Sequence, residues 1–217
     1  MPALRVEVVE ELAVFRRETL DPWLPAIRAA RTSGEPLENE YFKVMRGSRV
    51  EPPSGATDGE RVIVALAPLQ LQTRKGPVAL ARGEVVVLPF DDASDTPDAP
   101  FYEVLVKPGR PPSGFPGPYH EPGGNRVVHT GPRFRIFQER LNPGETRPVH
   151  SHDYRTVIPL NATKLEYWPA RRPDGPPDGT HVEVPDTVRF GQPVTHVIRN
   201  AGEQPLFNIV IELERPR

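Results

Sequence analysis

A series of short strand-like segments occurs twice along the chain. The matching pairs are 42–45 with 134–137, 61–66 with 155–160 and 100–106 with 205–211. The second pair aligns after a shift of two residues, and order and approximate spacing are otherwise kept. A repeat of this length favours a duplicated β domain over a solenoid, which needs three or more shorter units. The pattern therefore predicts two small antiparallel barrels or sandwiches.

The strand-like segments are separated by clusters of proline and glycine. The chain has 29 prolines and 17 glycines among 217 residues, gathered between short β-branched runs. Many short strands joined by tight turns have this composition. The longest such cluster begins after Val106 and ends at Gly124. We therefore predict one domain at 36–110 and a second at 125–217, joined by a linker at 111–124.

Residues 1–35 follow a different pattern. Apolar residues from Val8 to Thr19 recur every three or four positions, which is the helical repeat. Asp21 followed by Pro22 is typical of a helix N-cap with proline at the first helical position. We expect one or two short helices that pack on the outside of a β domain. A partner-binding amphipathic helix is the alternative.

Charge and composition exclude several classes of function. Lys and Arg number 27 against 29 Asp and Glu, so no positive field is expected to hold a phosphate backbone, and nucleic acid is a poor partner. No apolar run is long enough to span a bilayer, and the N-terminus lacks the pattern of an export signal. The absence of cysteine excludes disulfides, thiolate ligands and a cysteine nucleophile. We expect a cytoplasmic protein with no membrane partner.

Two histidines in the second copy have the spacing of metal ligands. His150 and His152 are separated by one residue, and side chains two apart in a strand share a face, so both imidazoles would point into one barrel. His196, in the segment 191–202, is the candidate third ligand. Three imidazoles suit a divalent first-row transition metal, such as Fe, Zn, Mn or Ni. The sequence therefore predicts a metal site at these three histidines.

The segments around these histidines resemble the two sequence motifs of the cupin superfamily. Residues 144–160 are similar to the first motif, Gly-x5-His-x-His, and 191–200 to the second, in which a histidine precedes an asparagine. In the first copy, 78–89 resembles the cupin strand pair that ends in proline. The resemblance covers about residues 40–213. It implies an all-β bicupin: two tandem RmlC-like jelly-roll (double-stranded β-helix) barrels, with the short helical segment before them.

The sequence departs from the cupin pattern at the first motif, which is degenerate. The family's glutamate would fall at Arg155 or Thr156, and the nearest acid, Asp153, is expected to point out of the barrel. A guanidinium at this position would weaken cation binding unless an anionic substrate or Asp153 offsets its charge. The cluster would then be three histidines without the family's acid.

The first copy departs further, because it has no histidine before His120. Pro53, Gly55 and Thr57 stand where the histidines would fall. The first barrel is therefore expected to hold no such metal and to serve as a structural or dimerising partner. His181 alternates with Glu183 in a predicted strand of the second copy, and we assign it no functional role.

Cupins include dioxygenases, isomerases, sugar epimerases, storage proteins and sensors, so the fold does not select a reaction. The leading hypothesis is a metal-dependent enzyme, of the non-haem oxygenase type, acting on a small anionic organic molecule. Arg155 would orient a carboxylate, and Tyr154 would contact the substrate if its strand stays regular.

Two alternatives remain open. One is a non-catalytic binding or sensing module that retains a relic site and no metal. The other is a metal-free isomerase or epimerase with a histidine as general base. This second alternative needs an acid beside a histidine, and none is evident in the sequence. Each hypothesis has a small-molecule ligand, and each is compatible with a homodimer.

Overall fold

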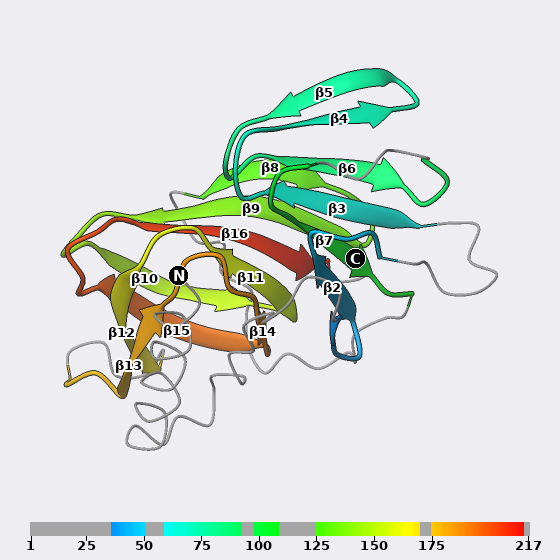
Figure 1. The fold of residues 1–217 in the computed structure, drawn as a ribbon. Coiled ribbons are helices and arrows are strands. Elements are labelled where there is room, and N and C mark those ends of the chain that lie inside the picture. Colours follow the sequence, from blue (N-terminus) through cyan, green and yellow to red (C-terminus); the bar gives the residue numbers. More distant parts are fainter. Residues whose placement is uncertain (1–35, 51–58, 93–97, 109–124, 170–174, 215–217) are drawn as a thin grey trace. The chain divides into compact units, whose positions relative to one another are not determined.

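The computed structural model of the chain describes residues 36–50, 59–92, 98–108, 125–169 and 175–214 (Figure 1). Every regular element in these ranges is a β-strand, which confirms the all-β prediction. The predicted helices of residues 1–35 and the predicted linker at 111–124 lie outside the described residues. In the described part of the chain no helix is long and apolar enough to cross a membrane.

The described strands fall into two compact units, β1 to β7 in one and nearly all of β8 to β16 in the other. The strands of the N-terminal unit are β1 (Leu37–Glu38), β2 (Phe42–Arg46), β3 (Glu60–Ala65), β4 (Leu69–Thr73), β5 (Gly76–Leu80), β6 (Val85–Pro89) and β7 (Phe101–Val106). Those of the C-terminal unit are β8 (Arg126–Thr130), β9 (Phe134–Leu141), β10 (Thr146–His152), β11 (Arg155–Pro159), β12 (Thr163–Pro169), β13 (Gly179–Glu183), β14 (Arg189–Gly191), β15 (Val194–Asn200) and β16 (Leu206–Leu213).

In the N-terminal unit a five-stranded sheet, β1-β2-β7-β3-β6, accompanies the hairpin β4-β5. The hairpin shows the two-residue period that places a strand over a core. Leu69 and Leu71 are buried, whereas Gln70 and Gln72 between and after them are exposed. Side chains of β3, β6 and β7 meet the hairpin in one apolar cluster. Its buried members are Ile63, Ala65, Leu69, Leu71, Leu80, Leu88 and Phe101.

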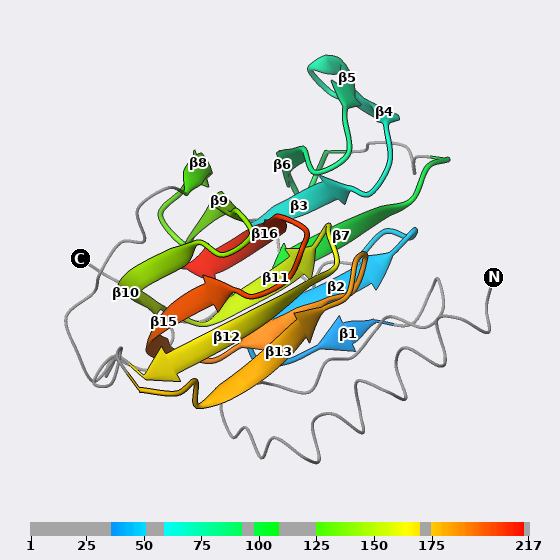
Figure 2. The same cartoon turned by 90° about the vertical axis from the view of Figure 1, so that its left-hand side faces the viewer.

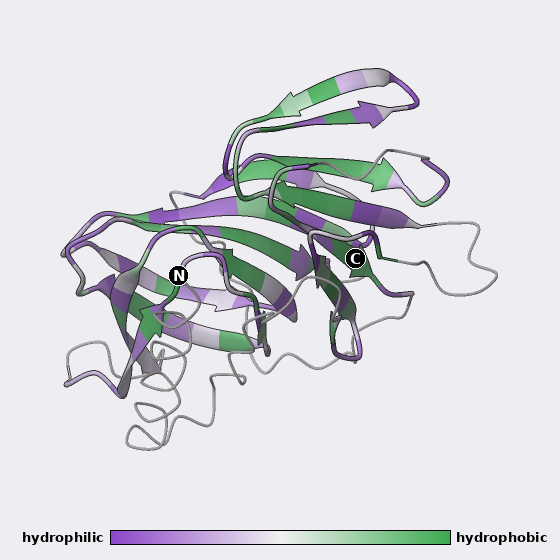
Figure 3. Cartoon of the chain, in the orientation of Figure 1, coloured by the Kyte–Doolittle hydropathy of each residue, from purple (hydrophilic) through white to green (hydrophobic). Residues whose placement is uncertain are grey.

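The C-terminal unit consists of a four-stranded sheet, β10-β15-β12-β13, and a five-stranded sheet, β14-β11-β16-β9-β8 (Figure 2). Apolar side chains form two small clusters in this unit, one around Leu141 and Leu165 and one at Phe137, Val157 and Val210. Many of its other buried side chains are polar or charged. Figure 3 shows this mixture along β9, where hydrophobic and hydrophilic residues follow one another. Buried polar side chains are the informative exception in a protein core, so this unit is the first place to look for a site.

The internal duplication predicted from the sequence appears in the sheet order of both units. The order β2-β7-β3-β6 in the first corresponds to β9-β16-β11-β14 in the second, strand for strand. The registers differ, because Arg61 pairs with Leu105 in the first unit and Arg155 pairs with Glu212 in the second. With the sequence alignment of β3 on β11 and β7 on β16, this is a slip of two residues. A slip of two keeps every side chain on its own face.

Two strands of the C-terminal unit, β8 and β10, do not coincide with an apolar run in the sequence. The β8 strand, Arg126–Thr130, is mostly exposed, so it has no buried face to produce an alternating pattern. In β10, Thr146–His152, charged, proline and histidine residues interrupt the period. The argument from His-x-His nevertheless required a strand there, and the structure has one.

Candidate metal centre

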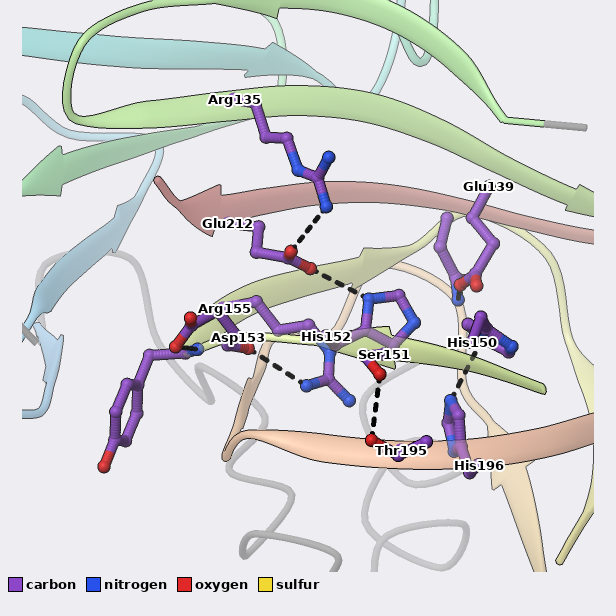
Figure 4. A network of polar contacts seen from close by, with 12 residues as sticks. Arg135, Glu139, His150, Ser151, His152, Asp153, Arg155, Thr195, His196 and Glu212 are labelled. Carbon is purple, nitrogen blue, oxygen red and sulfur yellow. Dashed lines mark hydrogen bonds and ion pairs between the residues drawn. The ribbon is translucent and has the colours of Figure 1, made fainter. Parts of the chain in front are cut away.

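The three predicted ligands lie together on neighbouring strands of the C-terminal unit (Figure 4). His150 and His152 belong to β10, and His196, on β15, is the cross-strand partner of His150. The ring centroids are 4.5 Å apart for His150 and His196, 4.9 Å for His150 and His152, and 5.4 Å for His152 and His196. One nitrogen of each ring lies within 4.8 Å of the corresponding nitrogens of the other two. The cluster can therefore hold a metal ion.

A β-bulge precedes the first histidine. Arg147 pairs with Ile198 and His150 with His196, so three steps along β10 match two steps along β15. Pro148 lies inside this irregular stretch and is exposed. Proline cannot donate to a strand ladder and is tolerated at bulges, and bulges near functional sites redirect side chains. The Pro148 bulge thus sets the register that places His150 opposite His196.

Hydrogen bonds fix the tautomers of two of the histidines. Nδ1 of His150 lies 2.8 Å from the carbonyl oxygen of Pro148, and Nδ1 of His152 lies 2.8 Å from Oε2 of Glu212. A carbonyl oxygen and an ionised carboxylate only accept, so each Nδ1 carries the proton and each Nε2 keeps a lone pair. Outer contacts of this type orient histidines that bind metals.

The spacing of one pair of ligand nitrogens fits a shared ion. Nε2 of His150 lies 3.1 Å from Nε2 of His196. With metal–nitrogen bonds of about 2.0–2.1 Å, adjacent ligand nitrogens are about 2.8–3.0 Å apart in octahedral geometry and about 3.3–3.4 Å apart in tetrahedral geometry. Three neutral imidazoles suit a divalent transition metal and leave further coordination positions open to water or substrate.

Burial keeps the three histidines in their neutral form. It lowers the pKa of His150 to about 4. It also lowers the pKa values of His152 and His196 well below the ordinary value, and the positive charge of Arg155 adds to the effect on both. At neutral pH each imidazole therefore keeps one unprotonated ring nitrogen, whose lone pair can bind a metal ion.

The expectation that no acid stands beside a histidine is wrong, because Glu212 of β16 contacts His152. Glu212 is 1 % exposed and also accepts a 2.8 Å hydrogen bond from Arg135. Burial raises the pKa of its carboxyl group, and Arg135 opposes that rise. A single acid two residues after the inward-facing Val210 is the sequence signal that could have identified it, since buried acids in apolar strands are rare.

Arg155 lies where the cupin glutamate was expected and is buried at the start of β11. Its Nη1 donates to the carbonyl oxygens of Gln192 at 2.7 Å and Asp153 at 3.2 Å. Burial and the nearby Arg189 lower the pKa of Arg155 to about 10, so it remains charged at neutral pH. Figure 4 shows its side chain extending toward the histidines.

Tyr154 was selected as a substrate contact on the condition that the strand of His150 and His152 continues through it, and the structure does not meet this condition. The β10 strand ends at His152, and Tyr154 lies in the short connection before β11, so the argument from a regular strand does not apply to it. The backbone N–H of Tyr154 donates to Oδ1 of Asp153 at 2.9 Å. Asp153 itself is buried and is not one of the three clustered ligands. A substrate contact by Tyr154 stays a prediction.

His181, to which no role was assigned, belongs to a second buried polar cluster. Its Nε2 lies 3.1 Å from Oε2 of Glu183, whose other oxygen accepts a 2.5 Å hydrogen bond from Arg189. Burial disfavours the charged form of Glu183, but Arg189 and His181 hold its pKa well below the ordinary range. The amide of Asn208 donates both to Glu183 at 3.3 Å and to Glu139 at 3.0 Å. The cluster ties β9, β13, β14 and β16 together.

Comparison with known proteins identifies the fold. No protein-family model and no curated protein matches the chain. AerE from Microcystis aeruginosa matches 90% of the chain and 100% of its own length, with a TM-score of 0.57 and 13% identity. A cupin 2 conserved barrel domain protein from Leptotrichia buccalis matches 88% of the chain and 100% of its own length, with a TM-score of 0.52 and 11% identity.

A third similar structure is an enzyme, salicylate 1,2-dioxygenase from Pseudaminobacter salicylatoxidans. It matches 94% of the chain and 82% of its own length, with a TM-score of 0.50 and 11% identity. These matches extend over both units, so the chain has the cupin fold in a two-barrel, bicupin-like arrangement. At such identities the likeness defines the fold and leaves the activity to be argued from the site.

Proposed function

We propose that the protein is a metal-dependent cupin enzyme of the oxygenase type, acting on a small anionic organic molecule at the C-terminal barrel. The observation that carries the proposal is the cluster of His150, His152 and His196, with nitrogens inside 4.8 Å of one another. The reaction type is compatible with the fold, which a salicylate 1,2-dioxygenase shares.

The residues around the cluster have separate roles in this proposal. His150, His152 and His196 would hold a divalent ion, which supplies a Lewis-acid centre with open positions and, if it is iron, redox chemistry. Glu212 keeps the proton of His152 on Nδ1. Phe137, stacked on the His152 ring at 6.1 Å between centroids, covers one face of that ring. Arg155 provides the positive charge that an anionic substrate needs.

The proposal is tested by titrating the metal-free protein with Fe(II) under anaerobic conditions and with Zn(II) in air. We expect one ion per chain, and no binding after the double substitution His150→Ala, His152→Ala. A His181→Ala variant is the matched control, because it removes a buried histidine outside the cluster. The proposal fails if the wild-type chain binds neither metal, or if the double variant binds as well as the wild type.

A second candidate function is favoured by the pair formed by His152 and Glu212. A histidine that donates to a carboxylate can act as a general base at its free Nε2, which is the arrangement a metal-free isomerase or epimerase requires. This candidate predicts that simple carboxylic and hydroxy acids raise the melting temperature equally with and without EDTA. The metal-dependent function predicts that EDTA abolishes most of that stabilisation.

A further inference from the structure

A series of hydrogen bonds links Arg135 to His152, one of the three clustered histidines. Nη2 of Arg135 donates to Oε1 of Glu212 at 2.8 Å, and Oε2 of the same carboxylate accepts a 2.8 Å hydrogen bond from Nδ1 of His152. Figure 4 shows the two contacts one after the other. All three side chains are buried. Hydrogen bonds to charged groups are stronger away from water, so this series holds the His152 ring firmly.

Arg135 also reaches the face of the His152 ring, by way of Phe137. Arg135 and Phe137 are two apart on β9, and side chains two apart in a strand share a face. Cζ of Arg135 lies 5.4 Å from the centre of the Phe137 ring, which is the range of a cation–π contact. The Phe137 ring in turn stacks on His152, with an interplanar angle of 11°. One guanidinium therefore contacts both groups that hold this imidazole.

Glu212 has other neighbours besides Arg135. Arg155 is its cross-strand partner on β11, and the backbone N–H of Asp153 also donates to it. The charge of Arg155 therefore stays beside Glu212 when Arg135 is removed. The direct hydrogen bond from Arg135 fixes Oε1, and with Oε1 fixed the second oxygen is directed at Nδ1 of His152. We expect loss of Arg135 to let the carboxylate turn away from His152 rather than to leave it without any counter-charge.

A second series of the same kind exists in the C-terminal unit. Arg189 pairs with Glu183 at 2.5 Å, and Glu183 lies 3.1 Å from Nε2 of His181. His181 is not one of the three clustered histidines. The two series thus share an arginine, a buried glutamate and a histidine, but only the first ends on a candidate metal ligand. Arg189 therefore provides a matched control for Arg135.

We propose that Arg135 is a positioning residue of the metal centre. It holds Glu212 by a hydrogen bond and Phe137 by a cation–π contact, so that His152 keeps its proton on Nδ1 and presents Nε2 to the ion. Its role in metal binding rests on the proposed function, whereas its effect on the orientation of His152 is a property of the metal-free chain.

The first test is 15N NMR of the imidazoles in the metal-free full chain, with the His152 signals assigned by their loss in His152→Gln. We expect the Nδ1–H tautomer of His152 in the wild type and a mixture of both neutral tautomers in Arg135→Gln. Circular dichroism checks that each variant is folded. Arg135→Lys keeps the buried charge and loses the planar donor, so it should give a smaller shift in the same direction.

The second test is Zn(II) affinity, measured by competition with a chromophoric chelator. Arg135→Gln should weaken binding about tenfold, at the lower end of the range for groups that orient a ligating histidine. Because Arg135 acts through Glu212, the effects of Arg135→Gln and Glu212→Gln should not add in the double variant. Arg189→Gln removes the same kind of ion pair and should leave both the Zn(II) affinity and the His152 tautomer as in the wild type.

The two tests separate failure of the positioning role from failure of the metal function. An unchanged His152 tautomer in both Arg135 variants would overturn the positioning role, even if Zn(II) affinity fell. An equal loss of Zn(II) affinity in Arg135→Gln and Arg189→Gln would also overturn it, since any broken ion pair would then have the same effect. A wild-type chain that binds no Zn(II), in which Arg135→Gln still shifts the tautomer, refutes the metal function and leaves the positioning of His152 standing.

Discussion

Replacing Glu183 with glutamine should lower the free energy of unfolding of the C-terminal unit by about 3–5 kcal/mol at neutral pH, the usual cost of removing one partner of a buried ion pair. Glu183 is 1 % exposed and accepts hydrogen bonds from Arg189, His181 and Asn208. Glutamine removes the negative charge, so the guanidinium of Arg189 stays buried without a counter-ion.

The difference in the free energy of unfolding between the wild type and Glu183→Gln should become smaller at acidic pH. The pKa of Glu183 is held well below its ordinary range, since Arg189 and His181 more than offset its burial. The stabilisation that the Glu183 charge gives the folded state is therefore complete above the unfolded-state pKa of about 4.3. It is lost progressively as the pH falls below that value. Protonated Glu183 resembles glutamine, so the two unfolding curves converge.

The measurement is a series of urea unfolding curves between neutral pH and about pH 3. Unfolding is monitored by the fluorescence of Trp168 in a protein that also carries Trp23→Phe. Glu203→Gln, which changes an exposed acid, is the control and should change stability by less than about 0.5 kcal/mol. A stability difference that stays constant down to pH 3 would contradict the role assigned to the Glu183 charge.

Replacing Glu212 with glutamine should weaken metal binding by about 10–100-fold, the effect typical of losing a carboxylate that orients a ligating histidine. The carboxylate lies 2.8 Å from Nδ1 of His152 and keeps the proton there, which leaves Nε2 for the ion. Glutamine accepts a weaker hydrogen bond and also leaves Arg135 without its counter-charge.

Zn(II) affinity is measured by competition with a chromophoric chelator, and the tautomer of His152 by 15N NMR of the imidazole. Glu212→Asp keeps the charge and should retain more affinity than Glu212→Gln, and circular dichroism checks that each variant is folded. Equal Zn(II) affinity in the wild type and Glu212→Gln would show that Glu212 does not position His152.

Much of the fold could be predicted because it depends on local pattern. The segment 69–72 alternates strictly between leucine and glutamine, and the structure has the matching burial. The repeated segments predicted a duplicated domain, and corresponding strands occupy corresponding sheet positions. The β8 strand was not predicted because it is mostly exposed, so its sequence does not alternate between apolar and polar residues.

The candidate site was predictable where it depends on spacing and unpredictable where it depends on register. His150 and His152 share a face because they are two apart, and the second motif located His196. Glu212 is 60 residues from His152 along the chain. Their contact exists because β16 pairs with β11 in a register that puts Glu212 opposite Arg155. No local pattern encodes that register.

The most direct test of the metal centre is elemental analysis of the purified wild-type chain beside the double variant His150→Ala, His152→Ala. Both proteins are loaded with Fe(II) or Zn(II), freed of excess metal and measured by inductively coupled plasma mass spectrometry. We predict close to one metal ion per wild-type chain and essentially none in the double variant. Absence of stoichiometric metal in the wild type, or equal metal in both proteins, would contradict the assignment of the three histidines as a metal centre.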